Sequence, residues 1–244
     1  MEYVPAAGTV IWRYMKLNSF LELLSGHLVQ TRIDVLHDAA EGAFGHKHIT
    51  FAPQMLERLG FNGKQTDAAE VIRRARTYAA ATYWFEFEER ESYGMWNVYG
   101  RSGESVAIET TVGALREVLS RDGEARIERM RYEPMRGEID NVHALFFHKR
   151  REYKEEREIR SVQVYDSPIA GTIVDQRLSL DDLNSLMKRI ILAPDSRQTF
   201  IEAVKRIVES VFAYEKRRFA GEICASALDQ DLIPQRTWVS EGHE

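Results

Sequence analysis

The 244-residue sequence contains a single cysteine, Cys224. One thiol excludes an internal disulfide framework and a cysteine-rich zinc site. No segment approaches the roughly 18 apolar residues of a membrane-spanning helix, and the N-terminus lacks the basic start and apolar run of a secretory signal peptide. We therefore expect a cytoplasmic protein with no membrane association.

Several well-known catalytic motifs are also absent. The sequence has no G-x-G-x-x-G dinucleotide fingerprint, no G-x-x-x-x-G-K-[ST] phosphate loop, no G-x-S-x-G nucleophile elbow and no H-E-x-x-H zinc motif. The formal net charge is −5, so no overall basic field is available to hold nucleic acid, although clustered arginines can still form local patches. A nucleic-acid partner is neither required nor excluded.

What the sequence does contain is enough apolar material for a packed core, with 44% hydrophobic and 10% aromatic residues. Patterns with strand and helix periods alternate along the chain, which predicts an α+β fold: a single domain over residues 1–232 with a mixed or antiparallel sheet flanked by helices, and a flexible tail over 233–244. Predicted strands cover 10–14, 28–32, 82–87, 105–109, 126–132, 161–165 and 190–192. Predicted helices cover a segment capped at Asn18-Ser19 and ended by Gly26, then 66–80, 95–99, 111–120 and 197–218, and another helix is expected to start within 140–148.

The most unusual segment is residues 147–160, FHKRREYKEEREIR, in which ten of fourteen residues are charged. If it is a strand, Glu156, Glu158 and Arg160 share a face with Val162, an apolar position that indicates the inner side of a sheet. Two carboxylates and a guanidinium then line a cleft. If it is a helix, the same charges form solvated i, i+4 pairs and have no catalytic meaning.

Two further regions have candidate site residues. The irregular stretch 34–53 contains His37, Asp38, Glu41, His46 and His48, which could hold a metal, although no established metal motif is present and we expect none. Farther along, residues 94–100 form a glycine-flanked aromatic segment. Its Trp96 and Tyr99 are spaced i, i+3 and would form an aromatic wall, or simply part of the core.

Several separated motifs together resemble a largely bacterial family, domain of unknown function 2971. In chain order these motifs are Trp12-Arg13-Tyr14, the helix leading to Gly26 and Leu28, the D-x-x-E of Asp38 and Glu41, M-W-x-x-Y-G at 95–100, and F-x-K-x-x-x-Y-x-x-E-x-E-x-R at 147–160. Two positions depart from the family's usual pattern. Alanines stand inside D-x-x-E where proline is frequent, and Tyr153 replaces a frequent tryptophan, so the pocket wall is expected to differ in shape.

The layout is also similar to that of ADP-ribosyltransferases, which bind NAD without a Rossmann fingerprint. This similarity implies that Glu158 stabilises the positive charge on the ribose while Glu156 helps to deprotonate the acceptor. The same similarity implies the remaining roles: Arg13 anchors the pyrophosphate or ribose beside Tyr14, Trp96 and Tyr99 flank the nicotinamide, Ser105 supports the glutamate, and Lys149 and Arg160 hold phosphate or orient the carboxylates.

The expected function is thus NAD-consuming ADP-ribosyl transfer to an unidentified nucleic acid or protein, in a toxin or phage-defence setting, with NAD as co-substrate. An alternative is a non-enzymatic sensor module whose charged cleft binds a ligand or a partner. A third is a Mg²⁺-dependent phosphodiesterase built on the acidic residues and Lys149. The sequence leaves open whether the protein is an enzyme, and it does not indicate the oligomeric state.

Overall fold

The structure, a computed structural model, describes residues 3–36, 46–61, 67–100, 104–120 and 125–229. The predicted tail 233–244 lies outside these ranges. The strands are β1 (Val10–Lys16), β2 (His27–Arg32), β3 (Ile49–Phe51), β4 (Ala79–Glu86), β5 (Ser105–Thr111), β6 (Ala125–Arg129), β7 (Gly137–Ile139), β8 (Glu158–Val164), β9 (Ile173–Arg177), β10 (Arg189–Leu192) and β11 (Glu222–Ala225). The α-helices are α1 (Leu17–Leu24), α2 (Pro53–Arg58), α3 (Ala68–Arg76), α4 (Tyr93–Tyr99), α5 (Val112–Leu119), α6 (Leu180–Leu186) and α7 (Gln198–Tyr214).

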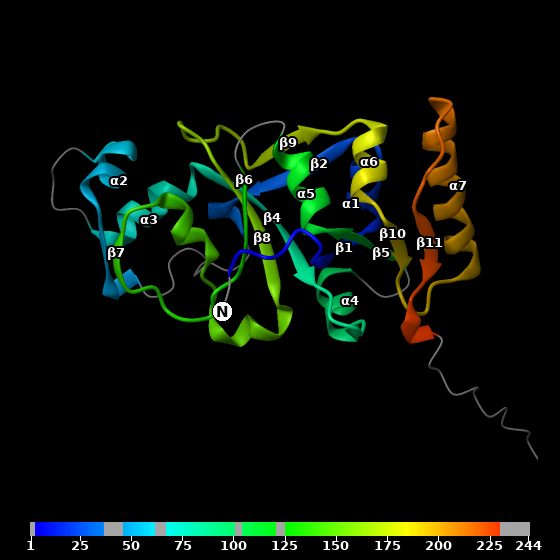
Figure 1. The fold of residues 1–244 in the computed structure, drawn as a ribbon, viewed down its shortest axis with the longest axis horizontal. Helices are drawn as coiled ribbons and strands as arrows, with labels where there is room; N and C mark the ends of the chain where they lie inside the picture. The colour runs from blue at the N-terminus through cyan, green and yellow to red at the C-terminus, as the bar shows by residue number, and fades with distance from the viewer. Residues whose placement is uncertain (1–2, 37–45, 62–66, 101–103, 121–124, 230–244) are drawn as a thin grey trace, which may run out of the picture.

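Most of the strands form one nine-stranded sheet, in which a central path runs β11-β10-β5-β1-β4-β2-β9. β8 pairs with the other edge of β4, and β6 pairs with β8. Only the pair β10–β11 is parallel among the pairings of this sheet in the described residues. The prediction of an α+β fold with a mixed sheet flanked by helices is therefore confirmed, and Figure 1 shows this sheet through the middle of the molecule.

β1 and β2 share one edge of β4 and diverge along it. β1 pairs with Phe85 and Glu86 at one end of β4, whereas β2 pairs with Ala80 and Ala81 at the other. The opposite edge of β4 pairs with β8 along seven consecutive residues. β8 is therefore held between β4 and β6, which explains why a strand that begins with charged residues is almost entirely buried.

The two faces of the sheet pack against different helices because side chains alternate along each strand. From β1, Ile11 and Met15 enter a core formed with apolar residues of α1, α5, α6 and α7. Trp12 and Tyr14 enter the opposite side and pack with Phe85 and with α4. On the same side as α4, a further core joins α2, α3 and the 3₁₀ helix Val142–Phe147.

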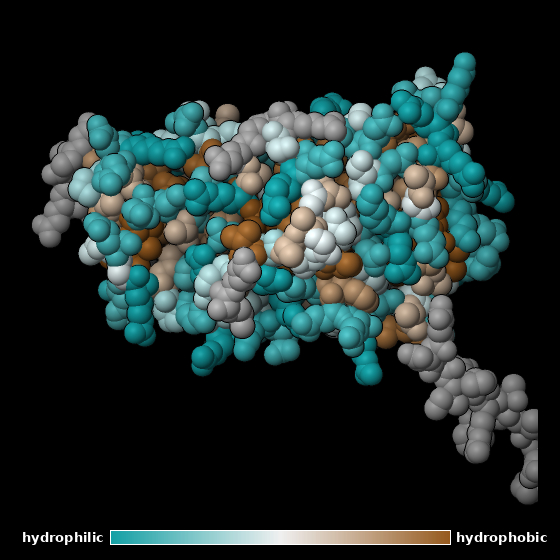
Figure 2. Space-filling view, in the orientation of Figure 1, coloured by the Kyte–Doolittle hydropathy of each residue, from teal (hydrophilic) through white to brown (hydrophobic). Residues whose placement is uncertain are grey.

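The molecule is elongated along the sheet, with α2 and α3 near one end and α7 near the other (Figure 1). On the face drawn in Figure 2, hydrophilic residues cover most of the surface and hydrophobic residues show only in small patches. Among the described helices, none has the length and apolar composition needed to cross a membrane.

Long periodic elements match their predictions, whereas helix ends and short elements differ. α5 is capped by Thr111, whose side chain accepts a hydrogen bond from the Ala114 amide. The first helix instead starts directly after β1, so Lys16 is its N-cap residue, not Asn18 or Ser19. The helix predicted over 66–80 ends at Arg76 because β4 begins at Ala79. Where a helix was expected to start within 140–148, a 3₁₀ helix spans Val142–Phe147, and β3, α2, β7, β9, α6 and β11 were not predicted.

Candidate functional site

Residues 147–160 adopt neither a continuous strand nor an α-helix. A 3₁₀ helix spans Arg151–Glu156, Arg157 has a left-handed backbone with φ of 50°, and β8 begins at Glu158. The prediction that Glu158 and Arg160 share a buried strand face with Val162 is confirmed. The prediction for Glu156 was wrong, because the left-handed turn at Arg157 separates it from the strand. The exposed α-helix is equally excluded.

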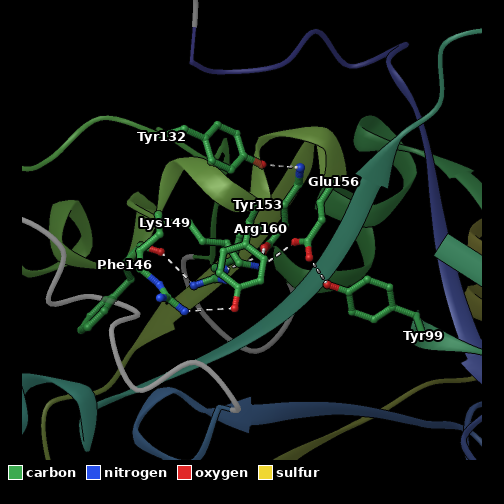
Figure 3. A network of polar contacts seen from close by, with 9 residues as sticks. Tyr99, Tyr132, Phe146, Lys149, Tyr153, Glu156 and Arg160 are labelled. Atoms are coloured by element: carbon green, nitrogen blue, oxygen red, sulfur yellow. Dashed lines mark hydrogen bonds and ion pairs between the residues drawn. The ribbon is translucent and has the colours of Figure 1, made fainter. Parts of the chain in front are cut away.

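Glu156 and Glu158 nevertheless meet, because both bind the same cation. The Lys149 ammonium donates to Glu156 Oε2 at 2.6 Å and to Glu158 Oε2 at 3.0 Å. Arg160 Nε donates to Glu158 Oε1 at 2.6 Å, and the Tyr99 hydroxyl donates to Glu156 Oε1 at 2.8 Å. Figure 3 shows this chain of contacts, which we call the Lys149 network. Its two carboxylates and two cations balance in formal charge.

Neighbouring groups hold the network in place. Arg160 Nη1 donates to the Phe146 carbonyl at 3.2 Å, and the Glu158 amide donates to the Tyr132 hydroxyl at 3.0 Å. The Lys149 ammonium also lies 4.6 Å from the centroid of the Tyr153 ring, a cation–π distance. The network is thus connected to the 3₁₀ helix Val142–Phe147, to the segment after β6 and to α4.

The network is buried at one end and reaches the surface at the other. The Glu158 and Arg160 side chains are each 1% exposed, whereas that of Glu156 is 14% exposed. Burial alone raises the pKa of Glu158, but the charges and hydrogen bonds of Arg160 and Lys149 outweigh that effect and hold the pKa below its usual value. Burial and the Glu156 carboxylate raise the pKa of the Tyr99 hydroxyl, so Tyr99 stays a neutral donor.

A pocket of about 630 Å³ lies next to Glu156. The lining residues are Trp12, Tyr14, Phe85, Glu86, Phe87, Glu88, Glu89, Arg90, Ser92, Met95, Glu155, Glu156 and Arg157. Trp12 and Phe87 stack with ring centroids 4.6 Å apart and planes within 4° of each other. The pocket therefore combines a flat aromatic wall with a carboxylate that Tyr99 and Lys149 hold in one orientation.

The pocket lining is acidic. Five of its residues are glutamates and two are arginines, so the lining residues alone have a formal charge of −3, and behind them Lys149 pairs with Glu156 and Arg129 pairs with Glu86. Arg157 is already paired with Glu86 and Glu88. Arg90 is exposed and has no ion pair among the described residues, so it is available to an anionic group of a ligand. Such a lining favours a cationic group inside the pocket and leaves one cation for an anionic group at its rim.

The pocket rim also has an unusual backbone conformation. Glu89 has φ of 132°, a conformation that residues other than glycine rarely adopt. Next to it, Glu91 accepts hydrogen bonds from Trp96 Nε1 at 3.1 Å, from Ser226 Oγ at 2.5 Å and from the Ala227 amide at 2.6 Å. These bonds connect the rim to α4 and to the segment that follows β11.

Of Tyr14, Trp96 and Ser105, which were expected to form the NAD site, only Tyr14 lines this pocket. The Tyr14 ring meets Trp96 edge-on with centroids 4.9 Å apart. Trp96 itself is fully buried and does not line the pocket. Ser105 is buried below Gly100, where a Cβ atom would come within 2.5 Å of the Ser105 Oγ. The aromatic wall of the pocket is Trp12 with Phe87, of which Trp12 is buried and Phe87 is half-buried.

Arg13 lies elsewhere. Its neighbour Trp12 points to the pocket, so Arg13 points to the other face of the sheet, where its guanidinium lies 5.7 Å from the centroid of the Trp84 ring. Its Nη2 donates to the Val29 carbonyl at 3.5 Å, across the divergence between β1 and β2. Burial lowers its pKa. The structure therefore does not bring Arg13 together with Glu156 and Glu158.

Most of the candidate metal ligands lie outside the residues that the structure describes. His37, Asp38 and Glu41 are not among the described residues, nor is the side chain of His46, and His48 is exposed. Within the described ranges, no group of three or more histidine, cysteine, aspartate or glutamate side chains is placed to hold a metal ion. Between Glu156 and Glu158, the Lys149 ammonium takes the position that a shared metal would need.

Sequence reasoning missed the roles of Trp12 and Phe87. The signal was present in part, because Trp12 alternates with Ile11 and Arg13 in a strand and so must face the side opposite to them. Phe87 lies just beyond β4 and reaches Trp12 only because β1 and β4 pair at Trp12 and Phe85. That pairing joins strands that are far apart in the sequence, so no local sequence pattern predicts it.

Comparison with known proteins gives distant structural matches only. No family model matches the sequence, so membership of domain of unknown function 2971 stays a prediction, and no curated protein matches it. Among solved structures, Thermus sp. 2.9 DarT in complex with ADP-ribosylated ssDNA aligns over 92% of this chain and 97% of that chain, with 12% identity and a TM-score of 0.40. Thermus sp. 2.9 DarT in complex with NAD+ aligns over 91% and 96%, with 10% identity and a TM-score of 0.40. Matches this distant transfer neither a residue role nor an activity to this chain.

Proposed function

We propose that this protein is an NAD-consuming, ADP-ribosyltransferase-like enzyme that acts on a nucleic acid or protein acceptor. The observation that carries the proposal is the Glu156 carboxylate, which Tyr99 and Lys149 orient at an aromatic pocket with a surplus of negative charge. A toxin or phage-defence role belongs to the same proposal and depends on the acceptor.

The pocket suits the nicotinamide end of NAD for electrostatic reasons. The nicotinamide ring of NAD is flat and carries a positive charge, so it can lie against Phe87, the half-buried ring of the aromatic wall, while the glutamates around it lower its energy. The pyrophosphate is anionic and is repelled by the same glutamates. We therefore assign the phosphate contact to Arg90 at the rim, where the guanidinium has no carboxylate partner among the described residues.

The reaction breaks the bond between the ribose C1′ and the nicotinamide nitrogen. The bonding electron pair leaves with nicotinamide, which becomes neutral, and positive charge develops on the ribose. A fixed carboxylate next to that carbon stabilises the developing positive charge. It lowers the barrier because the carboxylate is already oriented and needs no reorganisation free energy in the transition state. An acceptor oxygen or nitrogen then bonds to C1′ and releases its proton, for which Glu155 at the same pocket is an available base.

This proposal changes the expected division of roles. Glu158 is buried, and its two oxygens accept hydrogen bonds from Arg160 and Lys149, so we assign it a positioning role. It fixes Lys149, which in turn fixes Glu156. Glu156 is the carboxylate that lines the pocket, and we propose it as the catalytic residue. Arg13 lies on the opposite face of the sheet from the pocket, so we assign it no contact with NAD here. Its predicted role as an NAD anchor remains untested.

The test is the release of nicotinamide from NAD, measured with candidate nucleic-acid and protein acceptors and with water alone. Glu156→Gln keeps the shape of the side chain and should lower kcat by about a hundredfold or more, as the loss of one preorganised electrostatic group does in other enzymes. Glu152→Gln is the matched control, since Glu152 is an exposed glutamate of the same 3₁₀ helix. Arg90→Ala should raise KM for NAD, and Arg13→Ala tests the alternative anchor. If wild-type protein neither binds nor consumes NAD with any acceptor, the proposal fails.

One observation favours the non-enzymatic alternative. Glu158, the carboxylate expected to be catalytic, is fully paired and buried, as in a network that only stabilises a fold. A sensor module would bind a ligand saturably in the acidic pocket and release no product. Nucleotide turnover by wild-type protein that Glu156→Gln abolishes would exclude this alternative.

A further inference from the structure

A second pocket lies at the other end of β8, away from Glu158. Its volume is about 580 Å³. The lining residues are Gln54, Met55, Arg58, Arg126, Asp140, Asn141, Val142, His143, Gln163, Val164, Tyr165 and Asp166. None of these residues lines the pocket next to Glu156. Two of them, His143 and Arg126, have hydrogen-bonding groups that the described part of the protein leaves without a partner.

The protonation of His143 follows from its contacts. Its backbone amide donates to Asn141 Oδ1 at 2.9 Å, which identifies that side-chain atom as the oxygen. The His143 Nδ1 lies 3.0 Å from the same oxygen and must therefore carry a proton and donate it. Burial, together with the charges of Arg126 and Arg58, lowers the pKa of His143 to about 4. The ring is neutral near pH 7, so Nε2 has a lone pair that accepts a hydrogen bond.

No donor among the described residues reaches that lone pair. The His143 Nε2 is buried and has no hydrogen-bond partner in the described structure. An acceptor left in this state is destabilising, and native proteins usually satisfy such atoms with a protein group, water or a ligand. A ligand in this pocket reaches His143 Nε2 only when the ring or the atoms that cover it shift, and it must then bring an O–H or N–H donor of its own.

The same pocket contains a cation, Arg126, that has no partner among the described residues. Arg126 extends from β6, where it lies opposite Val162 of β8, and it is half-buried. No hydrogen bond or ion pair of its guanidinium is found among the described residues. Arg58 is paired with Asp166 at 3.2 Å, but the Asp166 side chain is fully exposed and that pair is strongly screened. Asp140 is also exposed. The less solvated charge is therefore the positive one of Arg126.

We infer that this pocket binds an anion that carries its own hydroxyl donor, of the class of hydrogen phosphate and phosphate esters. Arg126 pairs with the ionised oxygens, as guanidinium groups do with phosphate, and the hydroxyl donates to His143 Nε2. Sulfate offers oxygens of the same geometry but no proton near neutral pH, so it satisfies Arg126 and leaves His143 without a donor. The pocket should therefore prefer phosphate to sulfate.

The experiment compares the two ions by isothermal titration calorimetry with the full chain, at about pH 6, near the second pKa of a phosphate ester. Wild-type protein should bind phosphate saturably and more tightly than sulfate. Arg126→Ala should weaken the binding of both ions by roughly tenfold to a hundredfold, which is the cost of losing a charged hydrogen bond. Arg136→Ala, at an exposed arginine, is the control and should change neither affinity.

His143→Phe separates the two contacts. It removes the acceptor, so phosphate affinity should fall to that of sulfate while sulfate affinity stays unchanged. Circular dichroism and thermal unfolding of each variant establish that the fold is intact, and His143→Phe still tests the site if Arg126→Ala does not fold. The inference is overturned if phosphate shows no saturable binding, if sulfate binds equally well, or if His143→Phe leaves the preference for phosphate intact. None of these outcomes depends on NAD turnover.

Discussion

Replacing Lys149 by methionine tests how much of the protein's stability depends on the Lys149 network. Methionine keeps most of the length and apolar volume of the lysine side chain but removes the ammonium. Glu158 then loses its contact at 3.0 Å, and Glu156 loses its contact at 2.6 Å. Glu158 retains Arg160, and Glu156 retains Tyr99, so neither carboxylate is left entirely alone.

The size of the effect follows from burial. Glu158 is 1% exposed and Lys149 is 6% exposed, and removing one partner from a buried ion pair costs about 3–5 kcal/mol because the remaining charge stays out of water. Glu156 lies at the pocket and can regain water, so its contribution is small. The cation–π contact with Tyr153 adds about 0.5–1 kcal/mol. We expect the free energy of unfolding to fall by about 3–5 kcal/mol near pH 7.

The loss should depend on pH, with a sign that the pKa of Glu158 determines. In the wild-type protein this pKa lies below the unfolded value of about 4.3, so the stabilisation is present above that pH and is lost as the pH falls through the folded pKa. In the Lys149→Met variant the pKa of Glu158 rises toward its unfolded value. Lowering the pH therefore reduces the free energy of unfolding of the variant by less than that of the wild type. The difference between wild type and variant should therefore be largest near neutral pH and should narrow on acidification.

The assay is urea unfolding followed by circular dichroism at several pH values. Lys154→Met is the matched control, because Lys154 is an exposed lysine of the neighbouring 3₁₀ helix, and it should cost less than about 0.5 kcal/mol. A loss below about 1 kcal/mol for Lys149→Met, or one that does not change with pH, would refute the reasoning about buried charge.

Further substitutions test the local geometry, each by thermal unfolding. Gly100→Ala places a methyl group 2.5 Å from Ser105 Oγ and should destabilise the protein by about 1–3 kcal/mol, whereas Gly94→Ala, whose nearest atom lies 3.6 Å away, should cost less; equal losses would contradict the clash. Glu89→Gly relieves a backbone with φ of 132° and should raise stability by about 1 kcal/mol, and a lower melting temperature would show that no strain is stored there. Thr111→Ala removes the cap of α5 and should cost about 1 kcal/mol, and an unchanged melting temperature would count against the cap.

Local patterns were sufficient for the elements that are long or alternate strictly. α7 was predictable because its apolar residues repeat at helical spacing, and β1 because β-branched and aromatic residues cluster there. β9 and β11 were missed because their residues are mostly exposed or half-buried, so they show no apolar alternation. Their identity as strands depends on pairing with β2 and β10, which lie far away in the sequence.

The candidate site divides in the same way. The sequence alone indicated that residues 147–160 contain an unusual charged group and that, if they form a strand, Glu158 and Arg160 share a face with Val162, but it left an exposed helix equally open. It could not indicate that Arg157 turns left-handed and moves Glu156 off the strand. It also could not indicate that Tyr99 reaches Glu156 across 57 positions.

The amino-acid order by itself therefore determined the α+β class and the main periodic elements, because these depend on neighbours within a few residues. Only the tertiary structure decided which charges meet, that Arg13 lies on the opposite face from Glu158, and that Trp12 and Phe87 line a pocket next to Glu156. Those relations depend on which strands share an edge of β4, and strand pairing joins residues whose separation in sequence leaves no local pattern.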